Sequence, residues 1–593
     1  MRNIYSRVFD QRLNRILGWN YDDTSEGTPP SIIEETNRPV FSALLQNKLE
    51  GTHQLGKVKW DWAISRTEIN RDQKDVTYLN FTNKKIGDEY FYYTMPDVLG
   101  NTFKRVPFGR GSYLYNEKDY NWETSFSYPF ILGSFKNNLK VGYYGAAKEA
   151  TQDFFEVSLN AMRSATGSGG YLTPQELLMA PISVKLDQKN YNPNGFAWVP
   201  TWEAGNKFDG KVDQHAPYIM MDNRWNKFRL VWGLKAEYYL YKDIENTAYK
   251  TRWSYEGKTD DKKWQFLPSV NFTYTPWNNF NFRLAYSKSV IRPQFSERNK
   301  YPYYEPIMGG EIFNMPIISS VANNYDFKAE WYPSPGELIS VGLYYKNIDD
   351  PVELYRRITP DAANVFTRLN TKNAKVKGVE VDIQKDFSFI SESLRNLKFI
   401  GNLSINDTKV QVEEPSSVDE DGVSFKNEKG ESINKQIAYT DNRPLYGQSP
   451  YIFNLGLGYF GDRLGVNILY NKAGKMLNVV SFDEAGKEYL APYGKADAQI
   501  SYKLMKNKQL EIKLNVSNIF NEDYIYYNNE NSYQFNPPNS DKGRSDVRFQ
   551  NPVFYKKYAT HKEGWSDAYD EKDNVLYRFN VGRRFTLSFT YNF

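Results

Sequence analysis

The sequence has no cysteine, and it has only three histidines in 593 residues. Without cysteine, disulfide bonds, thiol nucleophiles, iron–sulfur clusters and cysteine-ligated zinc are excluded. An excess of one charge is also missing, because 75 Lys and Arg face 71 Asp and Glu, and the net charge of +4 does not favour nucleic acid as a partner. No apolar run approaches the roughly 18 residues that a transmembrane helix needs, so a helical membrane protein is excluded.

Aromatic residues, in contrast, make up 16% of the chain, although its mean hydropathy is very polar at -0.69. A disordered polar chain would not carry so many rings. A transmembrane β-barrel reconciles the two values, because its strands alternate lipid-facing apolar residues with lumen-facing polar ones and its interfaces carry aromatic girdles.

An alternation with a period of two residues is clearest at the end of the chain. Polar residues there separate the apolar Phe585, Leu587, Phe589, Tyr591 and Phe593. A strand places two such sets on opposite faces, whereas a helix would mix them. The same alternation runs through 496–504 and 510–516. The sequence therefore predicts an all-β fold, a transmembrane antiparallel β-barrel.

The connections between the predicted strands fall into two classes of length. Tight turns are predicted near 50–54, 224–226, 276–279, 333–336, 461–463 and 505–509. Loop-like connections cover 67–116, 157–213, 290–321, 411–448 and 521–576, with shorter ones near 19–39, 243–263, 349–373 and 475–493. This sorting is typical of an outer-membrane barrel with periplasmic turns and extracellular loops, and about 18 strands fit between the connections. The repeats of about 40–50 residues that a propeller would show are missing.

Charged residues of the predicted strands fall on the polar face. The set comprises Arg229, Lys235, Glu237, Arg283, Glu380 and Asp382. A shift of one residue would turn them toward lipid, where an arginine or lysine costs about 2–4 kcal/mol at the midplane. The alternation therefore predicts that these side chains face the lumen.

Four segments carry the motifs of a known family. They are YSKSVIRPQFSE (Tyr286 to Glu297), LYYKNIDDPVE (Leu343 to Glu353), NTKNAKVKGVEVDIQKDF (Asn370 to Phe387) and KLNVSNIFNEDY (Lys513 to Tyr524). In this order they resemble the barrel of a TonB-dependent outer-membrane receptor, of the type with carboxypeptidase-regulatory-like and plug domains upstream. The terminal Phe593 is similar to the aromatic residue that such barrels present to the assembly machinery.

The resemblance implies a barrel of about 22 strands with a plugged lumen. Counted back from Phe593, the first predicted strand, roughly Tyr5 to Leu17, is about the fifth strand of such a barrel. We therefore expect residues 1–593 to form one barrel domain, with the plug and the signal peptide not present in this chain. The beginning, MRNIYSRVFD, has no signal-peptide pattern, and we expect a longer protein.

The function that the resemblance implies is energised import of a scarce ligand through the outer membrane of a Gram-negative bacterium. The ligand classes left open are glycans, peptides and iron chelates. The implied partners are TonB with its inner-membrane motor proteins, the barrel-assembly machinery and the lipid bilayer, and in a glycan- or peptide-importing branch a surface lipoprotein lid. No cofactor and no nucleic acid are expected. The alternative is a passive or ligand-gated porin or adhesin-like barrel, because porins have about 16–18 strands.

Aromatic residues of the predicted loops are the candidates for ligand binding. They are Trp198, Trp202, Tyr301, Tyr303, Tyr304, Tyr526 and Tyr527. Their rings can stack on ligands and their polar atoms can orient them, although packing within the loops or membership of the girdle would also explain them. The six lumen charges are expected to contact a plug; the alternative is that they solvate a water-filled interior.

The sequence offers no catalytic constellation. His53, His215 and His561 are expected in or beside turns and loops, with no serine or carboxylate at the spacing of a triad or a metal site. No catalytic or metal-ligating residue is therefore predicted, and the protein is not expected to be an enzyme.

Overall fold

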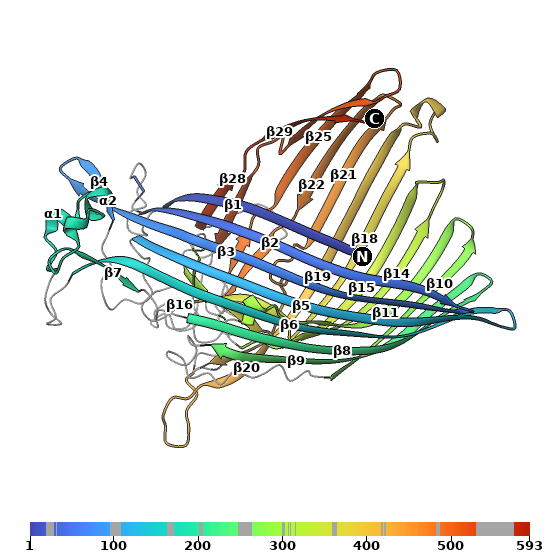
Figure 1. Ribbon diagram of the computed structural model, residues 1–593, viewed down its shortest axis with the longest axis horizontal. Coiled ribbons are helices and arrows are strands. Elements are labelled where there is room, and N and C mark those ends of the chain that lie inside the picture. Colours follow the sequence, from blue (N-terminus) through green and yellow to red (C-terminus); the bar gives the residue numbers. More distant parts are fainter. Residues whose placement is uncertain are drawn as a thin grey trace.

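The structure is a computed structural model, and most of its described residues lie in strands (Figure 1). It describes residues 1–18, 29–30, 32–94, 108–162, 171–200, 206–246, 264–298, 303–305, 308, 310–312, 314, 316–358, 364–416, 419, 423–481, 487–528 and 574–592. The helices are short: α1 (Gln175–Leu178), α2 (Ile182–Lys185), α4 (Phe295–Arg298) and the 3-10 turns η2 (Gln188–Asn190) and η3 (Glu392–Leu394). None of the described helices has the length and hydropathy to cross a bilayer.

One large antiparallel sheet contains 21 strands in the described part of the chain. Its meander, in which each strand pairs with the next, consists of β1 (Arg2–Gly18), β2 (Ile32–Leu55), β3 (Val58–Ile86), β5 (Phe108–Leu132), β6 (Phe135–Ala161), β8 (Asn206–Trp225), β9 (Phe228–Asn246), β10 (Trp264–Trp277), β11 (Phe280–Ile291), β14 (Ser320–Trp331), β15 (Leu338–Asp349), β18 (Asn373–Asp386), β19 (Leu397–Ser416), β21 (Tyr451–Phe460), β22 (Leu464–Ala473), β25 (Tyr493–Leu504), β26 (Leu510–Ser517) and β29 (Arg584–Tyr591). The other three pair at the side: β4 (Glu89–Thr94) with β3, β7 (Phe196–Pro200) with β6 and β20 (Lys435–Asp441) with β19. The prediction of about 18 successive strands is therefore confirmed.

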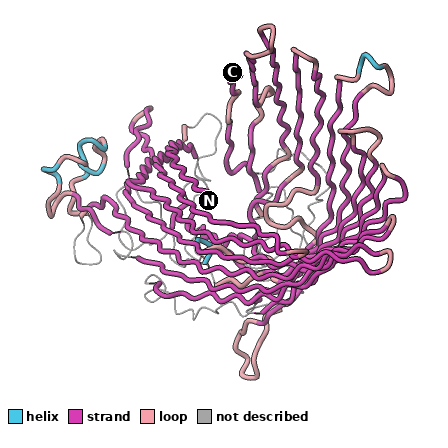
Figure 2. The backbone as a smooth tube through the Cα atoms, turned by 45° about the vertical axis from the view of Figure 1, so that its right-hand side comes forward, coloured by secondary structure: helices cyan, strands magenta, loops and turns pink. Residues whose placement is uncertain are grey.

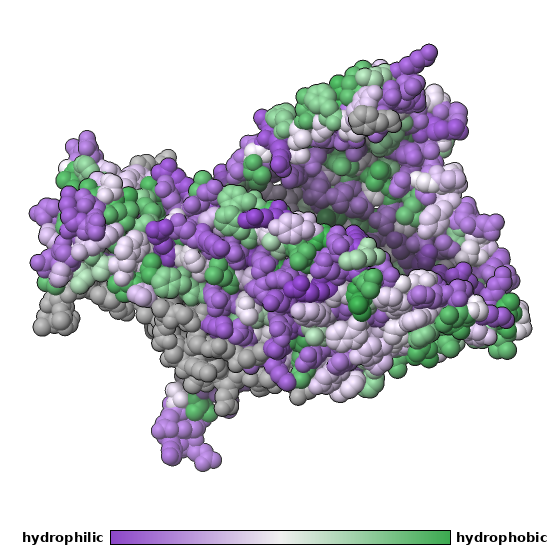
Figure 3. Space-filling model, viewed as in Figure 1, coloured by the Kyte–Doolittle hydropathy of each residue, from purple (hydrophilic) through white to green (hydrophobic). Residues whose placement is uncertain are grey.

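The large sheet is curved but open. No pairing joins the described residues of β1 to those of β29. Figure 2 shows the two chain ends on opposite sides of the opening. Figure 3 shows the hollow that the curved sheet encloses, with hydrophilic residues on much of the visible wall.

The alternation of the sequence gives this sheet two different faces. On β11, β14, β15, β18 and β19, the register aligns one apolar row of Leu284, Phe327, Leu343, Val379 and Ile405 and a second of Phe282, Ala329, Val341, Val381 and Leu403. We call this side the apolar face; its leucines at 284, 343 and 403 are exposed, as lipid-facing residues must be. The opposite side, the polar face, carries Arg283, Lys328 and Glu380 in one row.

Several tight turns need a left-handed backbone. Gly56, Gly133 and Asn226 have φ values of +60°, +60° and +50°, as two-residue hairpin turns require of their first residue. The turn predicted at 50–54 is wrong, because these residues belong to β2 and the chain turns at Gly56 and Lys57. The alternation does not mark this end, since β2 carries polar residues on both faces there.

A second, smaller sheet of eight described strands forms from the long connections, and we call it the loop sheet. Its strands, in spatial order, are β12 (Tyr303–Glu305), β13 (Gly310–Ile312), β17 (Asn364–Asn370), β16 (Val352–Ile358), β23 (Met476–Ser481), β24 (Glu488–Leu490), β27 (Asp523–Asn528) and β28 (Asn574–Asn580). The sequence analysis predicted loops here, and β3 and β5 also extend far into the predicted 67–116 loop. These predictions were wrong for two reasons. Short strands without clear alternation resemble loops in sequence, and the part of β3 near 67–75 carries polar residues on both faces.

The buried core lies at the loop end of the molecule. One cluster contains Tyr355, Leu477, Val480 and Tyr489 of the loop sheet, and another combines Phe154, Phe208 and Tyr241 of the large sheet with Phe295 of α4. Neither belongs to the apolar face. The long connections therefore fold as a packed structure of their own.

Candidate functional site

A buried charge network holds the loop sheet to the loop end of the large sheet. The Arg443 guanidinium donates two parallel hydrogen bonds to the Glu353 carboxylate, at 2.7 and 2.8 Å, and a third to Asp441 Oδ2 at 2.9 Å. Lys487 Nζ donates to the same Asp441 oxygen at 2.8 Å. All four side chains are at most 4% exposed. Two cations therefore compensate two carboxylates away from water.

The network connects three distant parts of the sequence. Glu353 lies on β16, Asp441 ends β20, and Lys487 precedes β24. Burial alone would lower the pKa of Arg443, but the attraction and hydrogen bonds of Glu353 raise it well above its ordinary value. Arg443 therefore stays charged at every physiological pH.

A second anchor fixes the segment after β11 on the polar face. Arg292 donates to Glu237 Oε1 on β9 at 3.1 Å and to Ser319 Oγ at 3.1 Å, and its guanidinium lies 4.2 Å from the ring centroid of Tyr239. At the end of α4, the Arg298 guanidinium lies 4.1 Å from the ring centroid of Tyr241. Arg292 within the segment Tyr286 to Glu297, and Arg298 directly after it, thus fix this segment by stacking on two tyrosines.

The six predicted lumen charges all lie on the polar face. Arg229, Arg283 and Glu380 share one register row. Arg229 pairs with Asp222 at 2.9 Å and Arg283 with Glu330 at 2.7 Å. Asp382 accepts from Lys328 at 3.2 Å and from Ser340 Oγ at 3.0 Å. Lys235 pairs with Glu237 at 3.0 Å, and Glu237 also pairs with Arg292 of the second anchor. Contact of this set with a plug stays a prediction.

Tyrosines gather on the loop sheet around a buried carboxyl group. Glu488 Oε1 accepts hydrogen bonds from Tyr577 Oη and Asn478 Nδ2, both at 2.5 Å, and burial raises the Glu488 pKa. The Tyr526 ring stacks on Tyr577 at 4.4 Å between centroids, and Tyr493 lies 4.6 Å from Tyr524. These four rings are partly exposed, so they can offer a ligand both flat surfaces and hydroxyl groups.

The comparison with known families decides what this arrangement belongs to. Residues 4–519 match the family described as TonB dependent receptor-like, beta-barrel. The chain belongs to this family. The resemblance predicted from the sequence motifs is therefore confirmed, and the protein is a receptor of the Gram-negative outer membrane and not an enzyme.

Solved structures similar to this receptor are more distant. The siderophore receptor PiuA from Acinetobacter baumannii shares 12% identity at a TM-score of 0.49, over 88% of this chain and 68% of its own. The ferric-catecholate import receptor Fiu from E. coli K12 shares 14% at 0.44, over 88% and 77%. P. aeruginosa FpvA bound to pyoverdine shares 12% at 0.46, over 88% and 68%. No curated protein matches the sequence.

The loop aromatics predicted to bind ligand have different surroundings in the receptor. Trp198 packs on Phe108 at 5.3 Å between ring centroids, and Tyr527 is 2% exposed in a core cluster. Both rings pack against neighbouring side chains, and their role in ligand binding stays a prediction. Tyr526 is partly exposed, and its role in ligand binding stays a prediction. The side chains of Tyr303 and Tyr304 on β12, and all of Trp202, Tyr301 and Phe593, lie outside the described residues.

His215 lies in the middle of a strand, where the sequence analysis expected a turn or loop, whereas His53 lies in a strand but beside a turn. His53 is in β2, where Trp62 Nε1 donates to it at 3.1 Å, and His215 is in β8, 2.6 Å from Tyr143 Oη. Both histidines stand among aromatic rings. The sequence analysis expected turns or loops at these positions because polar stretches within strands resemble turns in sequence. His561 lies outside the described residues. No group of three or more His, Asp or Glu in the described chain is arranged to hold a metal ion.

The sequence analysis missed Arg443, Asp441 and Lys487. It quoted Glu353 only as part of a motif, and single charged residues in a predicted loop look solvated. The available signal was the dipeptide of Arg443 and Pro444 beside Asp441, but only the fold brings these residues to Glu353, 90 positions earlier in the chain.

Proposed function

We propose that this receptor imports a scarce ligand actively, with energy delivered by TonB and its inner-membrane motor proteins. Membership of the TonB-dependent receptor family over residues 4–519 carries this proposal. The polar face supports it, because an interior lined by charged and amide side chains can pass a hydrophilic ligand or hold a removable plug.

We propose further that the free edges of β1 and β29 are closed by additional strands, as in a barrel of about 22 strands. An unpaired strand edge in the hydrocarbon region leaves backbone groups without hydrogen bonds, at several kcal/mol each. In this arrangement a plug would face the charges at Arg229, Lys235, Arg283, Glu380 and Asp382. Assembly by the barrel-assembly machinery, with Phe593 in its signal, belongs to the same proposal.

The tyrosine group of the loop sheet is the proposed ligand surface. Tyr493, Tyr524, Tyr526 and Tyr577 combine stacking faces with hydroxyl groups at the loop end of the receptor. Such a surface suits a glycan, a peptide or an iron chelate. If the ligand is a glycan or peptide, a surface lipoprotein lid is the expected additional partner.

The test is uptake in cells that produce or lack this receptor, in the presence and absence of TonB. The probes are a labelled ferric catecholate, ferric citrate, an oligosaccharide and an oligopeptide, supplied one at a time below micromolar concentration. We expect uptake of one probe to be lost equally in the receptor deletion and in the TonB deletion. Tyr526→Ala should weaken that uptake, whereas the control Trp198→Phe, whose ring packs on Phe108, should not.

The alternative function is a passive or ligand-gated pore. It is favoured by one observation, the hollow left by the curved sheet (Figure 3). A receptor that transports its probe at full rate without TonB, and that conducts ions steadily in a planar bilayer, would be a pore and would overturn the proposal of active import.

A further inference from the structure

The apolar face changes character abruptly near the loop end. Beyond its apolar rows, the register aligns Tyr286, Tyr325 and Tyr345. The next row across the same five strands is Lys288, Asn323, Asn347, Lys375 and Lys409, which we call the lysine row. Tyrosines mark the level where hydrocarbon meets headgroups, so the lysine row lies at the level of the headgroups.

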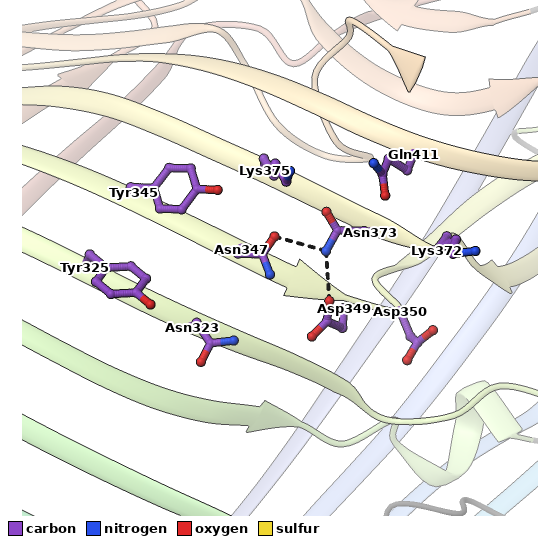
Figure 4. A pocket seen from close by; sticks show the side chains of 10 residues that line it. All are labelled: Asn323, Tyr325, Tyr345, Asn347, Asp349, Asp350, Lys372, Asn373, Lys375 and Gln411. Atoms are coloured by element: carbon purple, nitrogen blue, oxygen red, sulfur yellow. Dashed lines mark hydrogen bonds between the residues drawn. The ribbon is translucent and has the colours of Figure 1, made fainter. Parts of the chain in front are cut away.

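An open pocket of about 730 Å³ lies at the lysine row. Figure 4 shows its lining, in which Tyr325 and Tyr345 stand near the amides of Asn323 and Asn347. Asn373, two residues before Lys375 on β18, is opposite Gln411 in the register. Asn373 Nδ2 donates to Asn347 Oδ1 at 3.1 Å and to Asp349 Oδ1 at 2.8 Å. These bonds hold the pocket wall in place while other polar atoms stay open to a ligand.

Among the described residues, the pocket lining carries two lysines and two aspartates, and with the rows beside it the total is five lysines against four carboxylates. Lys377 pairs with Asp407 at 3.2 Å, and Lys372 pairs with Glu413. Asp349 accepts from Asn373, and Asp350 is the remaining carboxylate of the lining. In the described chain, no ion pair or hydrogen bond involves the ammonium groups of Lys288, Lys375 or Lys409.

Two of these lysines repel one another. Lys375 and Lys409 are directly opposite in the register of β18 and β19, and like charges in that position destabilise a sheet. An anion between them would convert the repulsion into two attractions. Phosphate is suited to this position because its several oxygens can accept from both ammonium groups and from a neighbouring amide at once.

We propose that the lysine row and its pocket bind the phosphate-bearing headgroup of a lipid in the outer leaflet. The acyl chains of that lipid would lie over the apolar rows at Leu343, Val379 and Ile405, which begin beyond one intervening row on the side of the turns. That intervening row carries Tyr345 and the ion pair of Lys377 with Asp407. The proposal rests on the outer-membrane location of the receptor and not on what it transports, so active import and lipid binding can fail independently.

The test measures lipid binding by native mass spectrometry, with the full receptor in neutral phosphatidylcholine nanodiscs. The probes are diphosphoryl lipid A and its monophosphoryl form, which differ by one phosphate. The double variant Lys375→Gln/Lys409→Gln is expected to bind the diphosphoryl probe roughly 30-fold more weakly, since each lysine near a membrane surface contributes about 1 kcal/mol of attraction to anionic lipid. It should also lose the preference between the two probes.

The matched control is Lys57→Gln/Lys506→Gln, which removes the same charge from two exposed turns at the other end of the strands. It should bind as the unchanged receptor does. Heat-modifiable mobility on gels verifies that each variant is folded. Unchanged affinity and preference in the Lys375/Lys409 variant would overturn the proposal. Full competition by inorganic phosphate at the concentration of the lipid would also overturn it, because the site would then bind free phosphate and not a headgroup.

Discussion

Ion pairs of the large sheet and ion pairs at the loop sheet differ in their exposure to water. In the large sheet, pairs such as Lys328 with Asp382 are more than one-third exposed and lie on the polar face. In the network that joins the loop sheet to the large sheet, Glu353, Arg443, Asp441 and Lys487 are almost fully buried. The first sheet is built from successive hairpins, whereas the second joins distant segments, with parallel pairings between β13 and β17 and between β16 and β23.

The difference shows what holds each sheet together. Alternation along each strand is enough to orient the large sheet, because a shift of one residue would expose its charges to lipid. The loop sheet has no lipid to orient it. A charge network that is satisfied in only one arrangement can supply this specificity, although such networks add little net stability.

The largest effect is expected from breaking the buried network. Glu353→Gln leaves two buried cations, Arg443 and Lys487, with the single carboxylate of Asp441. Removing one member of a buried pair costs about 3–5 kcal/mol. Hydrogen exchange of residues 352–358 and 476–481 should accelerate strongly, while exchange in β21 and β22 stays unchanged. The double replacement Glu353→Leu/Arg443→Met should recover much of the protection. Uniform acceleration in both sheets would contradict the view that the loop sheet opens separately.

The next largest effect is expected on the apolar face. Leu403→Arg places a charge in the lipid, at a cost of about 2–4 kcal/mol near the midplane. Asn402→Arg is the matched control, because Asn402 is the adjacent residue on the polar face. The free energy of unfolding in lipid vesicles should fall for the first variant and change little for the second. Equal losses for the two variants would mean that the faces are not different.

A smaller effect should depend on pH in the connection between β6 and β8. Lys185 of α2 is buried and donates to Thr94 O at 2.6 Å and Thr94 Oγ1 at 2.7 Å. Burial lowers its pKa to about 8, from an ordinary value of 10.5. Between these values the opened segment binds more protons than the folded one, so its stability should rise with pH.

Limited proteolysis by subtilisin at pH 7.5 and pH 9.5 tests this dependence. Cleavage near α2, normalised to an unfolded peptide of the same sequence, should be slower at pH 9.5. Lys185→Met, which carries no charge to bury, should flatten the profile. A cleavage rate in the unchanged receptor that is the same at the two pH values would refute the assignment of a costly buried charge.

The smallest effect is expected from Lys328→Met in the large sheet. Its pair with Asp382 is exposed to water, and such pairs contribute about 0–1 kcal/mol. Arg443→Met, in the buried network at the loop sheet, is the variant to compare with it. Chemical unfolding is monitored by hydrogen exchange. The exchange rates should change little for Lys328→Met and should rise strongly around the substitution for Arg443→Met. Similar changes in the two variants would remove the contrast between the sheets.

The sequence predicts the large sheet well and the loop sheet poorly, for a physical reason. The alternation of Leu403 and Ile405 with polar neighbours is imposed locally by the bilayer, so a short window of sequence contains it. The network at Arg443 depends on contacts across 90 residues, which no local window contains. The tyrosine group also depends on contacts between distant segments, because β24, β27 and β28 must pair before Tyr526 meets Tyr577.

The most direct test of the two-faced sheet is spin-label accessibility in the membrane. The natural sequence has no cysteine, so single cysteines at Asn402, Leu403, Ser404 and Ile405 of β19 can each carry one label. In lipid vesicles, collision with oxygen should be high at 403 and 405, and collision with a water-soluble nickel complex should be high at 402 and 404. A smooth profile, or the opposite parity, would contradict the assignment of the apolar face to lipid.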